Sequence, residues 1–134
     1  MDIQPIIRAA IAAKANAYAP YSHYQVGAAV LAASGSVYTG CNIENASYGL
    51  TICAERVALG TAIAAGERHF LALAIAGGEG TPAMPCGACR QFIAEWAEPS
   101  LKITVVSGLG EQVDLTLGDL FPRPFGPKSL KEER

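Results

Sequence analysis

The sequence has little charge: Asp, Glu, Lys and Arg make up 16% of its 134 residues, against about a quarter in typical soluble domains. Ten basic and twelve acidic residues give a net charge of −2, and no cluster of Lys and Arg forms a basic stripe. Without a field that favours phosphate polymers, we expect no nucleic acid partner. Because 51% of the residues are hydrophobic, we expect other subunits to cover part of the surface.

Long hydrophobic runs are also missing. The longest strongly apolar run, Phe70 to Ala76, has seven residues, whereas a helix that crosses a bilayer needs about 20. The first residues carry Asp2 and Arg8 between short apolar steps, and no secretion signal is visible there. We therefore expect a cytoplasmic protein with no membrane partner, whose four cysteines are reduced.

Hydrophobic patterning predicts helices that alternate with strands. The predicted elements are a helix from Ile3 to about Tyr18 that Pro20 stops, a hairpin of strands 26–33 and 37–41, a helix that opens at Cys53, a strand over 70–76, a helix from Pro85 to about Trp96, and strands over 102–107 and 113–116. This alternation predicts an α/β sandwich. One domain suffices for this length, and we place it at residues 1–127, with a charged tail over 128–134.

The segments Cys53-Ala54-Glu55 and Pro85-Cys86-Gly87-Ala88-Cys89 contain three thiols and one carboxylate. Zn²⁺ takes four tetrahedral ligands, so thiolates of Cys53, Cys86 and Cys89 would leave one position for water, as in a catalytic site. Glu55 can reach that water as a proton shuttle. A redox pair of Cys86 and Cys89 alone would leave Cys53 and Glu55 without a role.

Cys41 offers an alternative to this interpretation. A fourth thiolate would close the metal site and make it structural, as in a non-enzymatic zinc module for protein interaction. Cys41 precedes Cys53 by twelve positions, a spacing with no motif character, and free cysteines are often buried in cores. We therefore expect Cys41 to have a packing role on the second hairpin strand.

Three thiolates around Zn²⁺ leave a net negative charge, which weakens the metal as a Lewis acid. Both ligand segments stand at predicted helix starts, where free N–H groups and the positive end of the helix dipole can offset that charge. Arg56 follows Glu55 directly, and its guanidinium could fold back on the thiolates. We predict a charge-compensating role for Arg56; the alternative is an ordinary surface arginine.

A thiol, a Glu that is not a ligand and a downstream Pro-Cys-x-x-Cys are the signature of zinc-dependent nucleobase deaminases. The chain also contains the segments Gly40-Cys41-Asn42-Ile43-Glu44-Asn45-Ala46-Ser47-Tyr48-Gly49 and Arg90-Gln91. With these segments it resembles the free-nucleoside cytidine deaminases, in particular their small homotetrameric class. The resemblance covers about residues 5 to 127. It implies a three-layer α/β/α sandwich with a mixed central sheet of about five strands, a zinc cofactor, and a homotetramer with shared active sites.

The resemblance also implies the reaction: hydrolytic deamination of cytidine and 2′-deoxycytidine, a step of pyrimidine salvage. Hydroxide at the zinc would attack C4 of the cytosine ring, while Glu55 takes the water proton, delivers it to ring N3 and later helps ammonia leave. A second enzyme hypothesis is a deaminase of a modified cytosine nucleoside, such as an aminonucleoside antibiotic.

The substrate contacts come from residues outside the zinc motif. Asn42 and Glu44, two apart at the end of a strand, point the same way and can together bind a sugar hydroxyl, and the resemblance assigns them the ribose 3′-hydroxyl. The alternative is an Asx turn beside a solvated Glu. Tyr24 stands where the family usually has a Phe that contacts the base. The resemblance further implies base contact by Phe125 from a neighbouring subunit, sugar contact by Tyr48 across an interface, and a substrate contact by Ala54.

Overall fold

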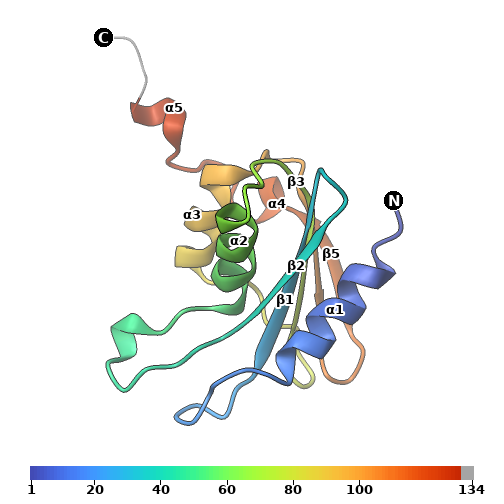
Figure 1. The fold of residues 1–134 in the computed structure, drawn as a ribbon, viewed down its shortest axis with the longest axis vertical. Coiled ribbons are helices and arrows are strands. Elements are labelled where there is room, and N and C mark those ends of the chain that lie inside the picture. Colours follow the sequence, from blue (N-terminus) through green and yellow to red (C-terminus); the bar gives the residue numbers. More distant parts are fainter. Residues whose placement is uncertain (131–134) are drawn as a thin grey trace.

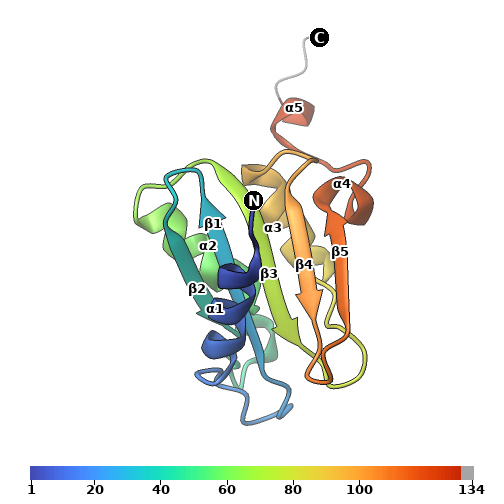
Figure 2. The ribbon, with the colours of Figure 1, turned by 90° about the vertical axis from the view of Figure 1, so that its right-hand side faces the viewer.

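A computed structural model describes residues 1–130 of the chain. Its helices are α1 (Gln4–Lys14), α2 (Ala54–Ala64), α3 (Gly87–Trp96), α4 (Leu117–Leu120) and α5 (Pro127–Leu130), with a 3₁₀ turn at Tyr48–Leu50. Its strands are β1 (Val26–Ala32), β2 (Val37–Cys41), β3 (Phe70–Gly77), β4 (Lys102–Val106) and β5 (Gln112–Thr116). The strands form one sheet in the order β2-β1-β3-β4-β5 (Figure 2).

The sheet is mixed. Strand β1 runs antiparallel to β2 and β3, β4 and β5 are antiparallel, and β3 and β4 are parallel. The parallel pair needs a crossover, which α3 supplies. Helix α1 covers one face of the sheet, while α2 and α3 lie side by side over the other (Figure 1). The prediction of a three-layer α/β/α sandwich with a five-stranded mixed sheet is therefore confirmed.

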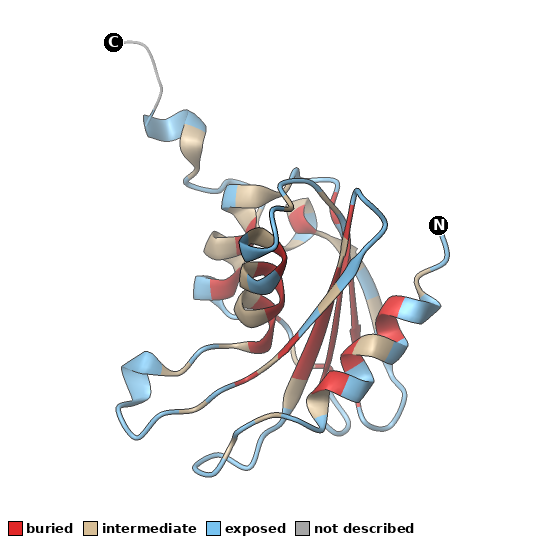
Figure 3. Cartoon of the chain, in the orientation of Figure 1, coloured by how far each residue is buried: buried red, intermediate tan, exposed pale blue. Residues whose placement is uncertain are grey.

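Two apolar clusters hold the three layers together, and alternate residues of the central strands supply them. On β3, Leu73 and Ile75 join the cluster under α2 and α3, whereas Ala72, Ala74 and Ala76 join the cluster under α1. The buried residues gather on the sheet and on the helix faces that meet it (Figure 3). The small alanine side chains on the α1 side let that helix approach the sheet closely.

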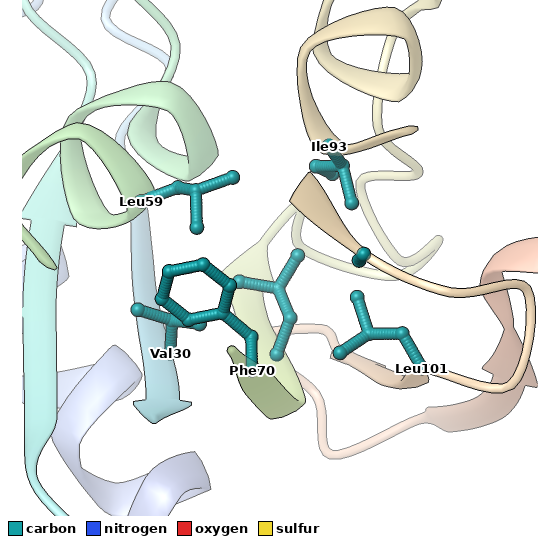
Figure 4. A pocket seen from close by; sticks show the side chains of 7 residues that line it. Val30, Leu59, Phe70, Ile93 and Leu101 are labelled. Atoms are coloured by element: carbon teal, nitrogen blue, oxygen red, sulfur yellow. The ribbon is translucent and has the colours of Figure 1, made fainter. Parts of the chain in front are cut away.

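A small cavity lies within the larger cluster, between the sheet and helices α2 and α3. It measures about 10 Å³, and its lining is wholly apolar, with Val30, Leu59, Phe70, Ile93 and Leu101 in view (Figure 4). A buried water needs a cavity of at least this size and two or more polar partners. The cavity is therefore a dry packing defect of the core and not a ligand site.

Helix α1 differs from the prediction, because it ends at Lys14 and not near Tyr18. The backbone N–H of Tyr18 donates to the carbonyl of Asn42 at 3.0 Å, and the N–H of Glu44 donates to the carbonyl of Tyr18 at 2.8 Å. This pairing holds Tyr18 in a β-bridge with Ile43. The prediction that the helix reaches Tyr18 is wrong, because a long-range backbone contact replaces the last helical turn.

The other predicted elements are confirmed to within two residues at each end, but the C-terminal part holds more helix than the sequence predicted. Helix α4 begins with a capping box, in which Thr116 and Asp119 each accept a hydrogen bond from the other's backbone N–H. Residues 128–130 of the predicted tail belong to the short, exposed helix α5. The rest of that tail, 131–134, lies outside the described residues, and the domain boundary at 127 stays a prediction.

Candidate active site

The thiols of Cys53, Cys86 and Cys89 lie together at the start of α2 and α3. Cys53 and Cys86 are the N-cap residues of these helices, and neither side chain makes a capping hydrogen bond. The Sγ atoms of Cys53 and Cys86 are 3.9 Å apart, and those of Cys86 and Cys89 are 3.5 Å apart. Tetrahedral zinc with Zn–S bonds of about 2.3 Å requires S···S separations of about 3.8 Å. The three thiols therefore fit one zinc ion.

The protonation of the thiols also favours a cation at this place. A hydrogen bond from Cys89 lowers the pKa of Cys53 to about 5, and Arg56 adds to the effect. The same hydrogen bond, together with burial and the charge of Glu55, raises the pKa of Cys89 far above its ordinary value. The Cys53 thiolate thus disfavours ionisation of Cys89, and a cation bound between the two would favour the thiolate form of both.

Arg56 lies directly against Cys53. Its Nη2 is 3.7 Å from the Cys53 Sγ and donates to the carbonyl of Thr51 at 3.3 Å. Its Nε is buried without a hydrogen-bond partner within residues 1–130. The guanidinium thus stands where the sequence analysis expected it, while its effect on zinc stays a prediction.

Glu55 is a buried carboxyl group, with 5% of its surface exposed. It is the second residue of α2 and lines the same pocket as Cys53 and Cys86. Burial raises the pKa of Glu55, and the charge of Cys53 raises it further. A carboxyl group with a raised pKa holds a proton more readily than usual, which suits a group that exchanges protons with a substrate.

The pocket at the thiols has a volume of about 260 Å³ and opens to the surface. Four segments that are distant in sequence form it: the approach to β1, the exit from β2, the start of α2, and the loop between β3 and α3. Among the predicted substrate residues, Tyr24, Asn42 and Ala54 line this pocket. Ser22, Thr51 and Met84 also line it, and sequence reasoning missed them because isolated loop residues carry no periodic signal.

Asn42 is buried and holds the loop in front of β1. Its Oδ1 accepts a hydrogen bond from the N–H of Val26 at 2.9 Å, and its Nδ2 donates to the carbonyl of Tyr24 at 2.8 Å. An amide oxygen has two lone pairs, so Oδ1 can still accept a hydrogen bond from a ligand. Asn42 therefore stabilises the loop through long-range contacts and not through the Asx turn of the alternative hypothesis, and it keeps the capacity to bind a hydroxyl group.

Glu44 is half-buried, and its carboxylate faces the loop that leads to Tyr24. Its Oε1 accepts from the N–H groups of Tyr21 and Ser22, at 3.0 and 3.1 Å, and its Oε2 accepts from the hydroxyl of Ser22. These hydrogen bonds lower the pKa of Glu44, and the largest contribution comes from the Ser22 hydroxyl. Glu44 lines a second pocket, which shares Ser22 and Thr51 with the first. Within one protomer, Asn42 and Glu44 thus line adjoining pockets, and their joint contact with one hydroxyl stays a prediction.

The aromatic residues predicted to act between subunits lie on the surface of the single chain. Tyr48 is 75% exposed and Phe125 is 58% exposed, and the Tyr48 ring lies 6.0 Å from that of Tyr21. Neither lines the pocket at the thiols. Cys41 lies on β2 and is not part of the thiol cluster found in residues 1–130, so this geometry gives the four-cysteine alternative no support.

Comparison with known proteins identifies the family. The protein-family model for the cytidine and deoxycytidylate deaminase zinc-binding region matches residues 1–105. The chain belongs to this family. The resemblance seen in the sequence motifs is confirmed, and zinc is the metal that the matched region binds. In the part of the chain that the structure describes, no helix is both long and apolar enough to span a membrane.

Relatives within the family match over nearly the full chain. A cytidine deaminase from Halalkalibacterium halodurans is 45% identical over 132 residues, which cover 98% of this chain and 100% of that protein. One from Mycobacterium tuberculosis is 45% identical over 122 residues, which cover 91% and 88% of the two chains. The crystal structure of cytidine deaminase from Burkholderia pseudomallei superposes with a TM-score of 0.89 at 47% identity, covering 93% of this chain and 100% of that one.

Proposed function

We propose that this protein is a zinc-dependent cytidine deaminase, which converts cytidine and 2′-deoxycytidine, with one water, to uridine and 2′-deoxyuridine with release of ammonia. The observation that carries this proposal is a single pocket that contains the thiols of Cys53 and Cys86, the buried carboxyl of Glu55 and the amide of Asn42. The names of the relatives support the substrate class. The runner-up is deamination of a modified cytosine nucleoside at the same site.

Cys53, Cys86 and Cys89 would hold the metal, because their sulfur separations fit a tetrahedral ion. A zinc ion held by these three thiolates would leave room for one water and would lower the pKa of that water towards about 7, which would supply a nucleophile at neutral pH. The Arg56 guanidinium beside Cys53 offsets part of the negative charge of the thiolates.

Glu55 moves the protons of the reaction. Its carboxylate accepts one proton from the attacking water and delivers it to N3 of the cytosine ring, where it stays in the product. It then takes the second proton from the new hydroxyl on C4 and passes it to the amino group, which leaves as ammonia as the C4–N bond breaks and the C4 carbonyl forms. The burial that raises its pKa suits a group that must first accept and then donate a proton. The ring of Tyr24 packs against the base, and Ala54 lines the pocket beside Glu55.

Asn42 and Glu44 bind the 3′-hydroxyl of the sugar. The hydrogen bonds from Tyr21 and Ser22 keep Glu44 ionised, so it accepts a hydrogen bond from a hydroxyl but repels a phosphate at the same position. Ribose and deoxyribose both carry a 3′-hydroxyl, whereas a polynucleotide continues there through phosphate. The substrate is therefore a free nucleoside.

We propose a homotetramer with shared active sites. The segment between β2 and α2 extends away from the sheet (Figure 1), and it exposes Ile43, Tyr48, Leu50 and Ile52. Large apolar side chains gathered on one protruding segment favour a protein interface. In the tetramer, Tyr48 contacts the sugar end of the substrate across an interface, and Phe125 reaches the base held by a neighbour. A light-scattering mass of one protomer would contradict both assignments.

We place the enzyme in the cytoplasm, as a single domain over residues 1–127 that serves pyrimidine salvage. A reducing compartment keeps three adjacent thiols from oxidation, which their function as metal ligands requires. A salvage reaction needs the free nucleoside that the 3′-hydroxyl contacts select.

The test is a substrate panel with the purified zinc-loaded protein. Ammonia release and the ultraviolet change from cytosine to uracil are followed for cytidine, 2′-deoxycytidine, free cytosine and a cytosine-containing single strand. Turnover of both nucleosides, with little on cytosine or the strand, is expected. Turnover of an aminonucleoside in place of cytidine would favour the runner-up, and inactivity on every substrate with zinc bound would overturn the proposed function.

A further inference from the structure

The two residues that follow Cys89 on α3 reach the C-terminal segment, residues 120–126, through their side chains. Arg90 Nε donates to the carbonyl of Pro85 at 2.8 Å, and Arg90 Nη1 donates to the carbonyl of Leu120 at 2.7 Å. The next residue, Gln91, donates from Nε2 to the carbonyl of Phe125 at 2.8 Å. Three consecutive residues of α3 thus supply the Cys89 thiol and side-chain hydrogen bonds to the carbonyls of Leu120 and Phe125.

The Arg90 contacts join the residue before Cys86 to the last residue of α4. A guanidinium is planar and donates in fixed directions, so holding one carbonyl in place constrains the other. Arg90 therefore links the backbone that enters the thiol cluster to the backbone that leaves α4. A lysine at this position would keep the charge but lose the fixed double contact.

Phe125 depends on Gln91 for its place on the domain. Beyond α4 the chain leaves the body of the domain and runs into α5, which projects away from the sheet and the other helices (Figure 1). Within residues 1–130, the Gln91 contact is the only hydrogen bond between the stretch 122–130 and the rest of the chain. Within its own protomer, this exposed segment is therefore positioned by the Gln91 hydrogen bond.

We propose that Arg90 and Gln91 are positioning residues that couple the metal centre to the C-terminal segment, so that Phe125 is presented in a fixed position only when the thiols are bound to metal. Metal loss frees Cys86 and Cys89, α3 shifts at its start, and both ties to the segment loosen. The coupling itself requires only a metal at the thiols, whereas its effect on turnover rests on the proposed function.

The first experiment measures hydrogen exchange by mass spectrometry in the zinc-loaded and chelator-treated full-length protein. Chelation should raise deuterium uptake at the N–H groups of Phe121 and Gly126, the two in residues 121–126 that donate hydrogen bonds, and leave the strands β1 and β3 protected. In Gln91→Leu, uptake at 121–126 should be high in both states. The control Gln4→Leu, at an exposed position on α1, should behave as the parent protein. Equal uptake with and without zinc in the parent protein would overturn the coupling.

The second experiment measures the rate of zinc release to a chelator. Arg90→Gln should release zinc about 10-fold faster, the lower end of the effect of residues that support metal ligands, and Arg90→Lys should recover part of the loss. Faster release from Arg90→Gln with unchanged uptake at 121–126 would reduce Arg90 to a local brace of Cys86 and overturn the coupling. If Arg90→Gln fails to fold, Arg90→Lys and Gln91→Leu carry the test.

Steady-state kinetics of Gln91→Leu test the positioning of Phe125 separately from the proposed function. In Gln91→Leu, KM for cytidine should rise about 10-fold with kcat nearly unchanged, as expected when a binding contact is lost equally in ground and transition states. An unchanged KM would overturn the positioning of Phe125. A parent protein that deaminates nothing would defeat the proposed function, while exchange and zinc release would still report on the coupling.

Discussion

The two helices that begin at the thiols are held in the fold by different means. Helix α2 packs directly on β1 and β2, and its Ala54, Ala58 and Ala62 have no exposed surface. Helix α3 buries only Cys89 and Ile93 completely, packs against α2 and α4, and is tied by the polar side chains of Arg90 and Gln91. The metal centre therefore depends on close backbone packing on one side and on directional hydrogen bonds on the other.

The largest effect is expected from loss of a ligand on either helix. Replacing any one of Cys53, Cys86 and Cys89 by alanine should abolish zinc binding and activity, because the two remaining thiolates do not complete a three-ligand site. Zinc content by elemental analysis measures this. Cys41→Ala is the matched control and should retain one zinc per chain. Retention of zinc by Cys53→Ala alone would mean that the α3 thiols suffice and that the helices contribute unequally.

The proton transfers, by contrast, should depend on one residue of α2, Glu55. Glu55→Gln should lower kcat by about 10²- to 10⁴-fold, the usual contribution of general acid–base catalysis, with zinc still bound. Steady-state turnover of cytidine together with zinc content measures this. Glu95→Gln, on α3 and away from the pocket, is the control and should turn over normally. Near-normal turnover by Glu55→Gln would remove the carboxylate from the mechanism.

Arg56 should have a smaller effect, through the charge of the thiolates. Arg56→Ala should weaken zinc binding by about 10- to 100-fold, as is typical of residues that support metal ligands, because Cys53 loses the cation that stabilises its thiolate. Competition with a metal chelator gives the affinity. If zinc affinity and activity are both unchanged, the guanidinium does not compensate the thiolate charge.

The smallest effect expected is on stability, and it distinguishes the packing of the two helices. A Cβ at Gly40 of β2 would lie 2.4 Å from the backbone nitrogen of Ala58 and 2.8 Å from the carbonyl oxygen of Ala54, both in α2. Gly40→Ala should therefore cost about 1–3 kcal/mol of unfolding free energy, as overpacking does. A Cβ at Gly87, the first residue of α3, meets nothing within 4 Å, and Gly87→Ala should change stability by less than about 0.5 kcal/mol.

Urea unfolding of the zinc-loaded proteins at one protein concentration compares these two variants, because metal and subunit binding both shift apparent stability. Equal midpoints for Gly40→Ala and Gly87→Ala would contradict the tighter packing of α2.

Much of the fold could be predicted from the sequence because its signals are local. Apolar runs predicted the hairpin and the other strands, and the metal motif placed the thiols at two helix starts. The end of α1 was not predictable, because Tyr18 pairs with Ile43, far along the chain. The helix α4 was missed because four residues are too few for a periodic pattern, although its capping pair was present at Thr116 and Asp119.

The sequence by itself determined the chemical groups of the site: three thiols, one carboxylate that is not a ligand, and an arginine beside them, since residue type and short spacing define such a motif. Only the tertiary structure decided how these groups are supported. Asn42 holds the loop at Tyr24, Ser22 binds Glu44, and Arg90 and Gln91 reach Leu120 and Phe125. These contacts join residues up to 34 positions apart, and long-range packing, which no local pattern encodes, brings them together.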